Sequence, residues 1–261
     1  MTSIHPTSVV DANAILGDNV EIGPLCVVGP RVRLGNGTRL VSHVVVDGCT
    51  TVGSECEIHP FARIGGPTQD LKYVGGDTFV EIGDRTVLRE CVTINCGTRE
   101  GEVTKVGSDT LLMAYCHAAH GCSIGNGVIV SNASQFAGEV IIEDRATVSG
   151  LIGAHQFTRI GTHSMVATSR LMLDAPPYMI TQGAEAIVTG INLVGLTRRG
   201  FTEETRNTLK LAYKMLYRSE MNFGDAIKKI EDELPNIPEI RHLVEFYRTS
   251  SRGVTRKVGN G

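Results

Sequence analysis

The chain has 261 residues, with 25 lysines and arginines against 28 aspartates and glutamates, and a formal net charge of -3 at pH 7. This length fits one or two domains, and so small a net charge gives no overall attraction for nucleic acid. The amino terminus lacks a basic segment followed by an apolar run, and no stretch is apolar enough to span a bilayer. We therefore expect a cytoplasmic protein with neither a membrane span nor a nucleic-acid partner.

An aliphatic residue returns at every sixth position from the amino terminus onward. The register is occupied by Ile4, Val10, Leu16, Ile22, Val28, Leu34, Leu40, Val46, Val52, Ile58 and Ile64. An amphipathic helix repeats at about 3.6 residues and a strand at two, so a six-residue unit predicts a solenoid of short strands and tight turns. The position four residues after each aliphatic one is mostly small, as at Cys26 and Ala62. The chain is therefore predicted to wind as a parallel β-helix with small residues packed at its corners.

Glycine often follows the aliphatic residue of the repeat, as at Gly17, Gly23, Gly29, Gly35 and Gly53. A residue without Cβ permits turn conformations, so we expect these glycines to form the turns between the strands. Large residues inside and small ones at the corners indicate a three-sided prism.

The register is interrupted twice, over residues 66–79 and 95–105, and we expect loops that leave the prism near both places. It resumes at Ile82 and again after the second interruption. Ala118 and Ala154 are undersized for it, and each lies beside a polar pair. The room near them either serves a ligand or reflects ordinary packing at a corner.

The solenoid is expected to end shortly after Pro176 and Pro177, because proline cannot donate a ladder hydrogen bond. We therefore assign residues 1–190 to the parallel β-helix, which makes the chain mainly β. The seven cysteines include no Cys-x-x-Cys pair, and we interpret them as packing residues rather than disulfides or zinc ligands.

Residues 191–261 are predicted to form a helical domain that covers the end of the solenoid. Thr202 can cap a first helix, Asn222 a second, and Pro238 stands where a third begins. The last residues, from Arg252, contain glycine and are expected to be disordered.

A regular prism has no chemistry of its own, so function is sought where polar residues break the pattern. The sharpest break is Tyr-Cys-His-Ala-Ala-His-Gly-Cys, residues 115–122, which contains His117 and His120. A histidine there can act as a general base near neutral pH, since its reference pKa is about 6.5. The pair could instead be solvated without a role, or bind a metal, although no third metal ligand is evident. A second polar pair, His155 and Gln156, lies near the same edge.

Several segments resemble one enzyme family and cover nearly the whole chain. They are Gln-Asp-Leu-Lys-Tyr (69–73), Lys-Val-Gly-Ser-Asp-Thr-Leu-Leu-Met (105–113), His-Ala-Ala-His (117–120), His-Gln-Phe (155–157), Pro-Pro-Tyr (176–178), Gly-Ile-Asn-Leu-Val-Gly-Leu (190–196) and Arg-Arg-Gly-Phe (198–201). They are similar to the bacterial acyl-carrier-protein:UDP-N-acetylglucosamine O-acyltransferases, the first enzymes of lipid A biosynthesis. The hexads also resemble hexapeptide-repeat proteins, which form left-handed parallel β-helices with three hexads per coil. The resemblance implies a homotrimer with sites between subunits and no cofactor or metal.

The resemblance also implies a role for each polar group. His120 would take the proton from the sugar 3-hydroxyl, which attacks the thioester of a 3-hydroxyacyl chain on acyl carrier protein, while the backbone N–H of Gly138 meets the oxyanion. Side chains implied to bind UDP-N-acetylglucosamine are Asp70, Lys72, His117, His155, Gln156, Asn192, Arg198 and Arg199. The acyl-chain pocket would include Met165 and Thr168, and a side chain at Thr168, where some members have Gly, is expected to shorten the preferred acyl group.

Three positions depart from the family pattern. Gly121 follows the histidine where members often have Asp, so whatever orients His120 must come from elsewhere. Glu139 and Val194 stand where some members have His and Glu. These changes leave open whether the acceptor carries a 3-hydroxyl or a 3-amino group.

Three other interpretations remain open. A γ-type carbonic anhydrase shares the histidine-bearing trimer but needs three metal ligands from two subunits. A related N-acyltransferase of the same pathway usually adds an amino-terminal domain, whereas the hexads here begin at Ile4. A purely structural solenoid would not explain the loop segment 69–73 or the Arg-Arg segment.

Overall fold

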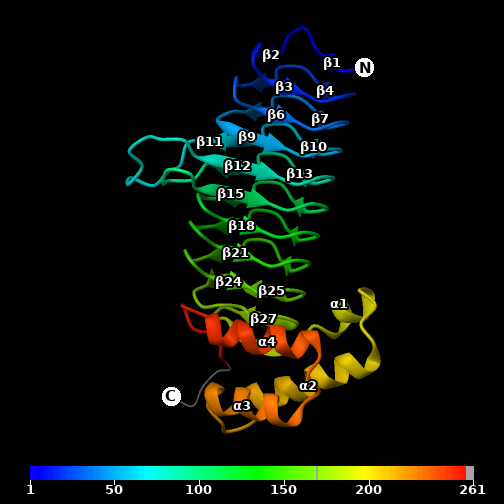
Figure 1. Ribbon diagram of the computed structural model, residues 1–261, viewed down its shortest axis with the longest axis vertical. Helices are drawn as coiled ribbons and strands as arrows, with labels where there is room; N and C mark the ends of the chain where they lie inside the picture. The colour runs from blue at the N-terminus through cyan, green and yellow to red at the C-terminus, as the bar shows by residue number, and fades with distance from the viewer. Residues whose placement is uncertain (169, 257–261) are drawn as a thin grey trace.

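The chain winds as a stack of short coils with helices at one end (Figure 1). The computed structural model describes residues 1–168 and 170–256, and only the backbone at residue 168. Within these residues the strands form three sheets. The first contains β1 (Ser3–Ile4), β4 (Glu21–Ile22), β7 (Arg39–Leu40), β10 (Glu57–Ile58), β13 (Val87–Leu88), β16 (Leu111–Leu112), β19 (Ile129–Val130), β22 (Thr147–Val148), β25 (Met165–Thr168), β27 (Met179–Gly183) and β28 (Ile187–Ile191).

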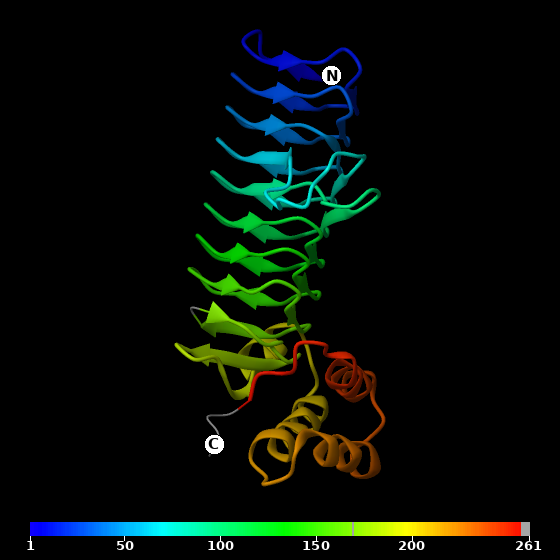
Figure 2. The ribbon, with the colours of Figure 1, turned by 90° about the vertical axis from the view of Figure 1, so that its left-hand side faces the viewer.

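The other two sheets form the remaining faces of the prism. The second contains β2 (Val9–Val10), β5 (Val27–Val28), β8 (Val45–Val46), β11 (Arg63–Gly66), β14 (Thr93–Asn95), β17 (His117–Ala118), β20 (Gln135–Phe136), β23 (Gly153–Ala154) and β26 (Arg170–Leu171). The third contains β3 (Ile15–Leu16), β6 (Arg33–Leu34), β9 (Cys49–Val52), β12 (Phe79–Ile82), β15 (Val103–Val106), β18 (Ser123–Ile124), β21 (Ile141–Ile142) and β24 (Arg159–Ile160). Figure 2 shows the coils stacked along one axis.

The register of the parallel strands gives the length of a coil. Ile4 pairs with Ile22, and Ile22 pairs with Leu40, so neighbouring strands of one sheet are 18 residues apart. One coil therefore takes three hexads, one for each face of the prism. The predicted parallel β-helix is what the structure shows.

The aliphatic residues of the repeat fill the interior of the prism. Ile22, Leu40 and Ile58 are almost wholly buried, as are the smaller residues Cys26 and Ala62 four positions after the aliphatic ones. All seven cysteines are free; five of them are buried, whereas Cys49 and Cys91 are only partly buried. Hydrophobic burial along the whole stack stabilises the coils, since each coil covers its neighbours.

The glycines after the aliphatic residues do not form the turns, contrary to the sequence-based expectation. The left-handed turn residues stand two positions later in the repeat, as at Leu25 (φ 58°) and Phe61 (φ 65°). Gly29 and Gly35 lack a positive φ, but a Cβ on Gly35 would lie 2.5 Å from the carbonyl carbon of Gly53 in the next coil. Glycine is therefore needed at this position because neighbouring coils approach closely, not because the turn requires its φ.

The two undersized positions of the repeat make room for an aromatic ring. Ala118, Phe136 and Ala154 are successive partners across β17, β20 and β23, and all three are buried. The small side chains thus flank the large one inside the prism. Of the two interpretations left open, packing accounts for Ala118 and Ala154.

Two irregular connections leave the prism at the same corner. Residues 67–78 link β11 to β12, and residues 96–102 link β14 to β15, so both pass from the second sheet to the third. The longer one protrudes beside β11 in Figure 1. The Thr68 and Thr98 hydroxyls hydrogen-bond at 2.8 Å, and the Asp77 N–H donates to Glu100 Oε2 at 3.0 Å. The two loops therefore support each other.

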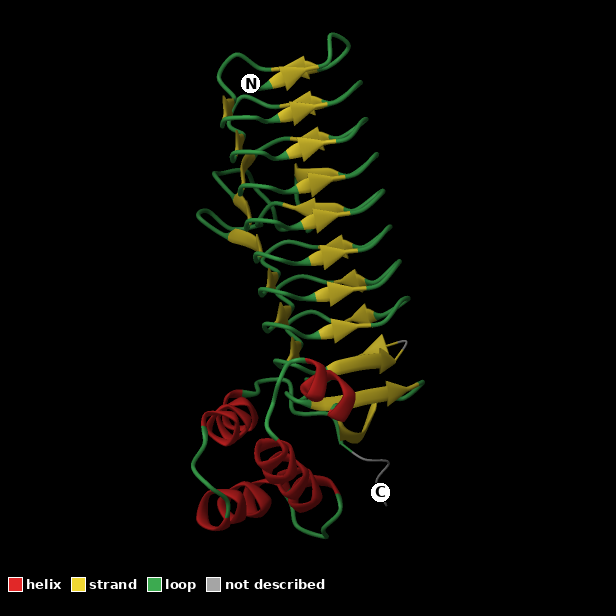
Figure 3. Ribbon diagram, turned by 90° about the vertical axis from the view of Figure 1, so that its right-hand side faces the viewer, coloured by secondary structure: helices red, strands yellow, loops and turns green. Residues whose placement is uncertain are grey.

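After the last coil, β28 folds back antiparallel to β27 and leads into helices. These are α1 (Leu193–Arg198), α2 (Glu203–Tyr217), α3 (Phe223–Glu233) and α4 (Pro238–Thr249), which lie at the carboxyl-terminal end of the stack (Figure 3). Thr202 and Asn222 cap α2 and α3 as predicted, and α4 starts at Pro238. The short helix α1 was not predicted. No helix among the described residues combines the length and the apolar character needed to cross a membrane.

The buried residues form two clusters, one from Val20 to Ala175 inside the prism and one from Tyr178 to Val254 among the helices. The division into domains at residue 190 stays a prediction. The expectation of a disordered tail from Arg252 is wrong for residues 252–256. Val254 is buried and bridges Asp174, and Tyr217 donates to the Thr255 carbonyl at 2.9 Å. An apolar side chain and a buried donor thus hold this segment, and residues 257–261 lie outside the described part.

Candidate active site

Five stretches of chain meet at the corner between the second and third sheets. Both loops leave the prism there, and the turns from β17 to β18, from β20 to β21 and from β23 to β24 lie below them. These turns carry His120, Gly138 and the pair His155 and Gln156. Residues predicted from different segments therefore share one edge because the 18-residue coil places every third turn at the same corner.

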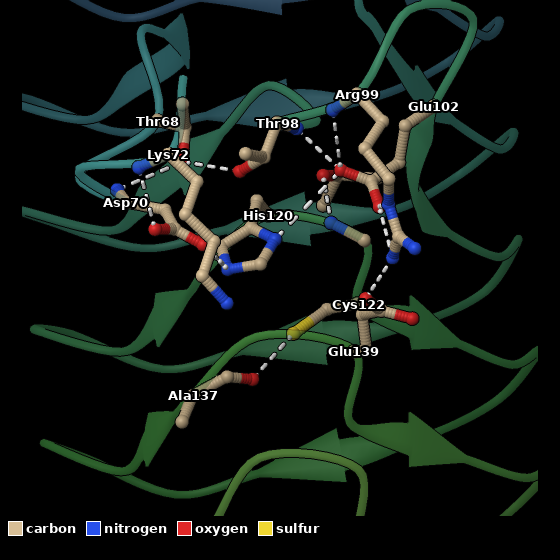
Figure 4. A network of polar contacts seen from close by, with 12 residues as sticks. Thr68, Asp70, Lys72, Thr98, Arg99, Glu102, His120, Cys122, Ala137 and Glu139 are labelled. Carbon is tan, nitrogen blue, oxygen red and sulfur yellow. Dashed lines mark hydrogen bonds and ion pairs between the residues drawn. The ribbon is translucent and has the colours of Figure 1, made fainter.

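His120 is the centre of this corner. Its side chain is 18% exposed, and its Nε2 lies 3.6 Å from Asp70 Oδ2. On the other edge of the ring, Nδ1 lies 3.7 Å from Glu102 Oε2. Figure 4 shows the imidazole between the two carboxylates, each carried by one of the two loops. The loops thus enclose the histidine on the solvent side of the prism.

Gly138 lies against the His120 ring in the next coil. A Cβ on Gly138 would meet Nε2 and lie 2.5 Å from Cε1 of that ring. Its carbonyl accepts from the Phe157 N–H at 3.1 Å, whereas its own N–H donates no hydrogen bond within the described residues. Gly138 therefore packs against the ring nitrogen that faces Asp70, and its N–H is free to donate.

Asp70 and Lys72 belong to the longer loop. The Asp70 N–H donates to Thr68 Oγ1 at 3.1 Å, and Asp70 Oδ1 accepts from the Lys72 N–H at 2.9 Å. These bonds make a tight local turn that aims the Asp70 carboxylate at His120 (Figure 4).

Glu102 is fixed from both sides. Its Oε2 accepts from the N–H groups of Thr98 and Arg99, and its Oε1 accepts from Arg99 Nη2 at 3.2 Å. Burial raises the pKa of Glu102, but these donors and the Arg99 charge outweigh it and hold the pKa below its usual range. The side chain therefore carries a negative charge at neutral pH. Arg99 also pairs with Glu139.

His117 lies on β17, and its ring contacts the adjacent coil. Its Nδ1 is 2.7 Å from Thr93 Oγ1. Burial lowers the pKa of His117, and the contact with Thr93 opposes this only in part. His117 is therefore neutral at pH 7 and can offer one donor and one acceptor. Two coils further, just after β23, His155 Nδ1 lies 3.2 Å from the carbonyl oxygen of Gln156.

The other three residues implied to bind the sugar nucleotide lie elsewhere in the chain. Asn192 caps α1, accepting from the Gly195 N–H at 3.1 Å and donating to the His163 carbonyl at 3.0 Å. Arg198 and Arg199 end the same helix. It follows the first sheet, which is the face opposite the corner of His120, and Figure 1 shows α1 and the longer loop on opposite sides. One chain does not bring these two groups together.

The acyl-pocket candidates lie on the last coil. Met165 begins β25 and is partly buried. The side chain of Thr168 lies outside what the structure describes, so the expected effect on acyl length stays a prediction.

One group among the described residues has the spacing of a metal site. Ligand atoms of Glu102, His120 and Glu139 lie within 4.8 Å of one another. Arg99 pairs with both carboxylates and already supplies a positive charge there. The group contains one histidine, so it does not match the three ligands of a γ-type carbonic anhydrase.

Sequence reasoning missed Glu102 and Arg99. Both stand in the second interruption of the register, where Arg99, Glu100 and Glu102 concentrate charge in a short segment. This concentration of charged residues in a loop at a corner of the solenoid was the feature of the sequence that could have indicated a functional role. The contact with His120 could not be predicted because it depends on how the loop folds back.

Comparison with known proteins identifies the family of the chain. Residues 174–255 match the family described as Udp N-acetylglucosamine O-acyltransferase, domain 2, and residues 13–48 match the bacterial transferase hexapeptide family. The acyl-(acyl-carrier-protein):UDP-N-acetylglucosamine O-acyltransferase of Thermodesulfovibrio yellowstonii is 45% identical over 258 residues, covering 98% of this chain and all of the relative. The chain belongs to this O-acyltransferase family.

Solved structures of O-acyltransferases agree over the same length. The enzyme from Bacteroides fragilis superposes with a TM-score of 0.95 at 40% identity, covering 97% of this chain and 100% of that one. The enzyme from Acinetobacter baumannii gives 0.93 at 39% identity, with 97% and 99% covered. The fold is the predicted left-handed parallel β-helix with carboxyl-terminal helices, and the predicted family is confirmed.

Proposed function

We propose that this chain transfers a 3-hydroxyacyl group from acyl carrier protein to the 3-hydroxyl of UDP-N-acetylglucosamine, in the first step of lipid A biosynthesis. The observation that carries the proposal is the 45% identity, over nearly the whole length of the chain, to a relative named as an acyl-carrier-protein-dependent UDP-N-acetylglucosamine O-acyltransferase. The relative's name specifies acylation of an oxygen rather than of an amine, so the O-acyl product is favoured. The donor is a thioester on the phosphopantetheine of acyl carrier protein, and the reaction uses no metal or cofactor.

His120 acts as the general base in this proposal. Its Nε2 removes the proton from the sugar 3-hydroxyl as the oxygen attacks the thioester carbonyl carbon. The resulting oxyanion accepts a hydrogen bond from the free N–H of Gly138, the residue that packs against the ring. The intermediate then expels the thiolate, which takes the proton from the His120 imidazolium. No covalent intermediate with the enzyme is needed.

The sugar nucleotide is held from two sides. Asp70 and Lys72 of the longer loop lie next to His120 and suit hydroxyl and phosphate groups, while His117, His155 and Gln156 line the same edge. Arg198 and Arg199 suit the diphosphate, because guanidinium groups bind phosphate oxygens in pairs, and Asn192 stands at the start of their helix. These residues lie on the opposite face of the chain, so a second copy must supply them. We infer a homotrimer whose three sites lie between neighbouring subunits.

The remaining assignments follow from this site. Met165 and Thr168 are proposed to line the acyl pocket. The enzyme is proposed to work in the cytoplasm, where acyl carrier protein and the sugar nucleotide are available.

A direct test is to incubate the purified protein with UDP-N-acetylglucosamine and a panel of 3-hydroxyacyl carrier proteins. Mass spectrometry of the sugar nucleotide should show one added 3-hydroxyacyl group. His120→Ala should reduce the rate by about 10² to 10⁴, which is the usual contribution of a general base.

His59→Ala is a closely matched control. The His59 side chain is 17% exposed and also lies between two carboxylates, with Glu57 at 3.6 Å and Glu90 at 3.4 Å. It is outside the corner of His120 and should keep full activity. Absence of product from the wild type with every donor would refute the function, and wild-type activity of His120→Ala would refute the base.

A further inference from the structure

The Nδ1 atom of His120 has no hydrogen-bond partner. It is shielded from solvent, and no group of the described chain lies within hydrogen-bond distance. A buried ring nitrogen without a partner is costly, because it has lost water and gained nothing in return. The nearest acceptor is Glu102 Oε2, at 3.7 Å. A shift of less than 1 Å therefore completes a hydrogen bond between them.

The position and charge of Glu102 suit it to accept this hydrogen bond. Thr98 and Arg99 fix both of its oxygens, and its side chain is 13% exposed. Its charge persists at neutral pH because these donors hold its pKa low. A rigid, ionised and buried carboxylate next to an unpartnered imidazole nitrogen is the arrangement that orients a general base in hydrolases of the Ser-His-Asp type.

Gly121 explains why the carboxylate comes from a distant loop. This residue has a φ of +65° and carries no side chain that can reach the ring. A Cβ at Gly121 would lie 3.1 Å from Glu102 Oε1 and 2.9 Å from Glu139 Cγ. The side chains of Glu102 and Glu139 thus occupy the space that a side chain on residue 121 would use.

We propose that Glu102 is the positioning residue for His120, accepting a hydrogen bond from Nδ1–H and keeping Nε2 unprotonated and directed toward the substrate. The inference rests on the proposed function, in which Nε2 is the base. Asp70 is the competing acceptor, since it lies 3.6 Å from Nε2 and favours the opposite tautomer. Burial of the ring favours the hydrogen bond to Glu102 over the one to Asp70. Nδ1 is buried and has no other partner, whereas Nε2 faces the open side, where the sugar hydroxyl would bind.

The first test removes the carboxylate. Glu102→Ala should lower kcat about 10- to 100-fold with little change in KM, because Glu102 does not touch the substrate. Glu81→Ala is the control, since Glu81 pairs with Lys105 on the outer surface of β12 and its loss should leave kcat unchanged.

The second test moves the carboxylate to residue 121. In Glu102→Ala/Gly121→Asp the loss of the Glu102 side chain frees part of this space, and the flexible Glu139 side chain, 2.9 Å from the new Cβ, has to move aside. Asp tolerates the left-handed backbone at this position. This double variant should recover most of the lost kcat, whereas Glu102→Ala/Gly121→Asn should not. A purely structural role for Glu102 predicts no difference between the two doubles, and that result would overturn the proposal.

A third measurement does not require catalysis. Nitrogen-15 NMR of histidine-labelled protein, with His120 assigned from His120→Ala, should show the Nδ1–H tautomer in the wild type and a mixture in Glu102→Ala. If the wild type makes no acylated sugar, the proposed function fails but this spectrum still tests Glu102. An unchanged tautomer in Glu102→Ala would reject its positioning role.

Discussion

At the scale of single residues, the site depends on two glycines whose missing side chains do different work. Gly138 has an ordinary backbone conformation but leaves room for the His120 ring. Gly121 adopts the left-handed conformation and leaves room for Glu102. The position of His120 therefore depends on the space that these two glycines leave as well as on the side chains around it.

Gly138→Ala should place a methyl group on the His120 ring and displace it. A shift of about 1 Å at a reacting group can cost 10²-fold in rate, and we expect a loss of that order in kcat with an unchanged melting temperature. Steady-state kinetics and thermal unfolding would check this. Gly224→Ala in α3 adds the same methyl group far from the corner and should keep full activity. Retained activity in Gly138→Ala would show that the ring does not need its present place.

At the scale of elements, the helices join the solenoid through a small set of mixed contacts. His163, on the turn before β25, stacks on Tyr178 at a centroid distance of 6.1 Å and meets Phe201 edge-on at 4.8 Å. The carboxylate of Glu143 also joins this region, accepting from His242 Nε2 of α4 at 2.7 Å and from Arg159 at 2.9 Å. These contacts attach α4 and the loop before α2 to the last coils.

Stability should fall between pH 6.5 and pH 4 through His163. Burial lowers the pKa of His163 to about 4, with help from the charges of Arg145 and Arg199 and against that of Asp144. In the unfolded chain the histidine pKa is about 6.5, so between pH 6.5 and pH 4 the unfolded chain binds a proton at His163 and the folded chain does not. The free energy of unfolding therefore has its full value above pH 6.5 and decreases as the pH falls through this range.

His163→Phe should weaken this pH dependence. The aromatic packing is kept, and Phe61 and Phe157 show that phenylalanine accepts the same positive φ in this chain. Urea unfolding at pH 7 and pH 5 should show that the wild type loses on the order of 1 kcal/mol more than the variant, after allowance for partial exposure. Equal losses in both proteins would exclude His163 as the titrating group.

At the scale of the whole molecule, the proposed function requires more than one chain. The base and both loops lie at the corner between the second and third sheets, whereas α1 with Arg198 and Arg199 follows the first sheet on the opposite face. A straight, rigid solenoid cannot bend to bring these faces together. In the proposed function, a neighbouring copy therefore completes the site.

Two inactive variants should therefore complement each other. Mixed trimers of His120→Ala and Arg198→Ala/Arg199→Ala, formed by co-expression, should regain up to about a quarter of the wild-type activity, since that fraction of interfaces pairs two intact surfaces. Mixing His120→Ala with Gly138→Ala should restore nothing, because both residues lie on one surface. No activity from the first mixture would contradict a site shared between neighbouring copies.

The sequence by itself determined the solenoid. A period of six residues with aliphatic and small positions allows few other structures, because each coil buries the same residues against the next. Every hexad carries this pattern, so it can be recognised from a short stretch of sequence. The helix caps at Thr202 and Asn222 were predictable for the same reason, since capping depends on neighbouring residues. His120 stood out because it breaks the repeat.

The tertiary structure alone decided what surrounds His120. Glu102 reaches it from a loop whose path no periodicity encodes, and Ala118 proved to be small because Phe136 lies next to it in the following coil. The docked residues 252–256 were missed because their contacts lie with Asp174 and Tyr217, far away in sequence. Repeats determine local geometry, whereas contacts between loops, tails and distant turns depend on the complete fold.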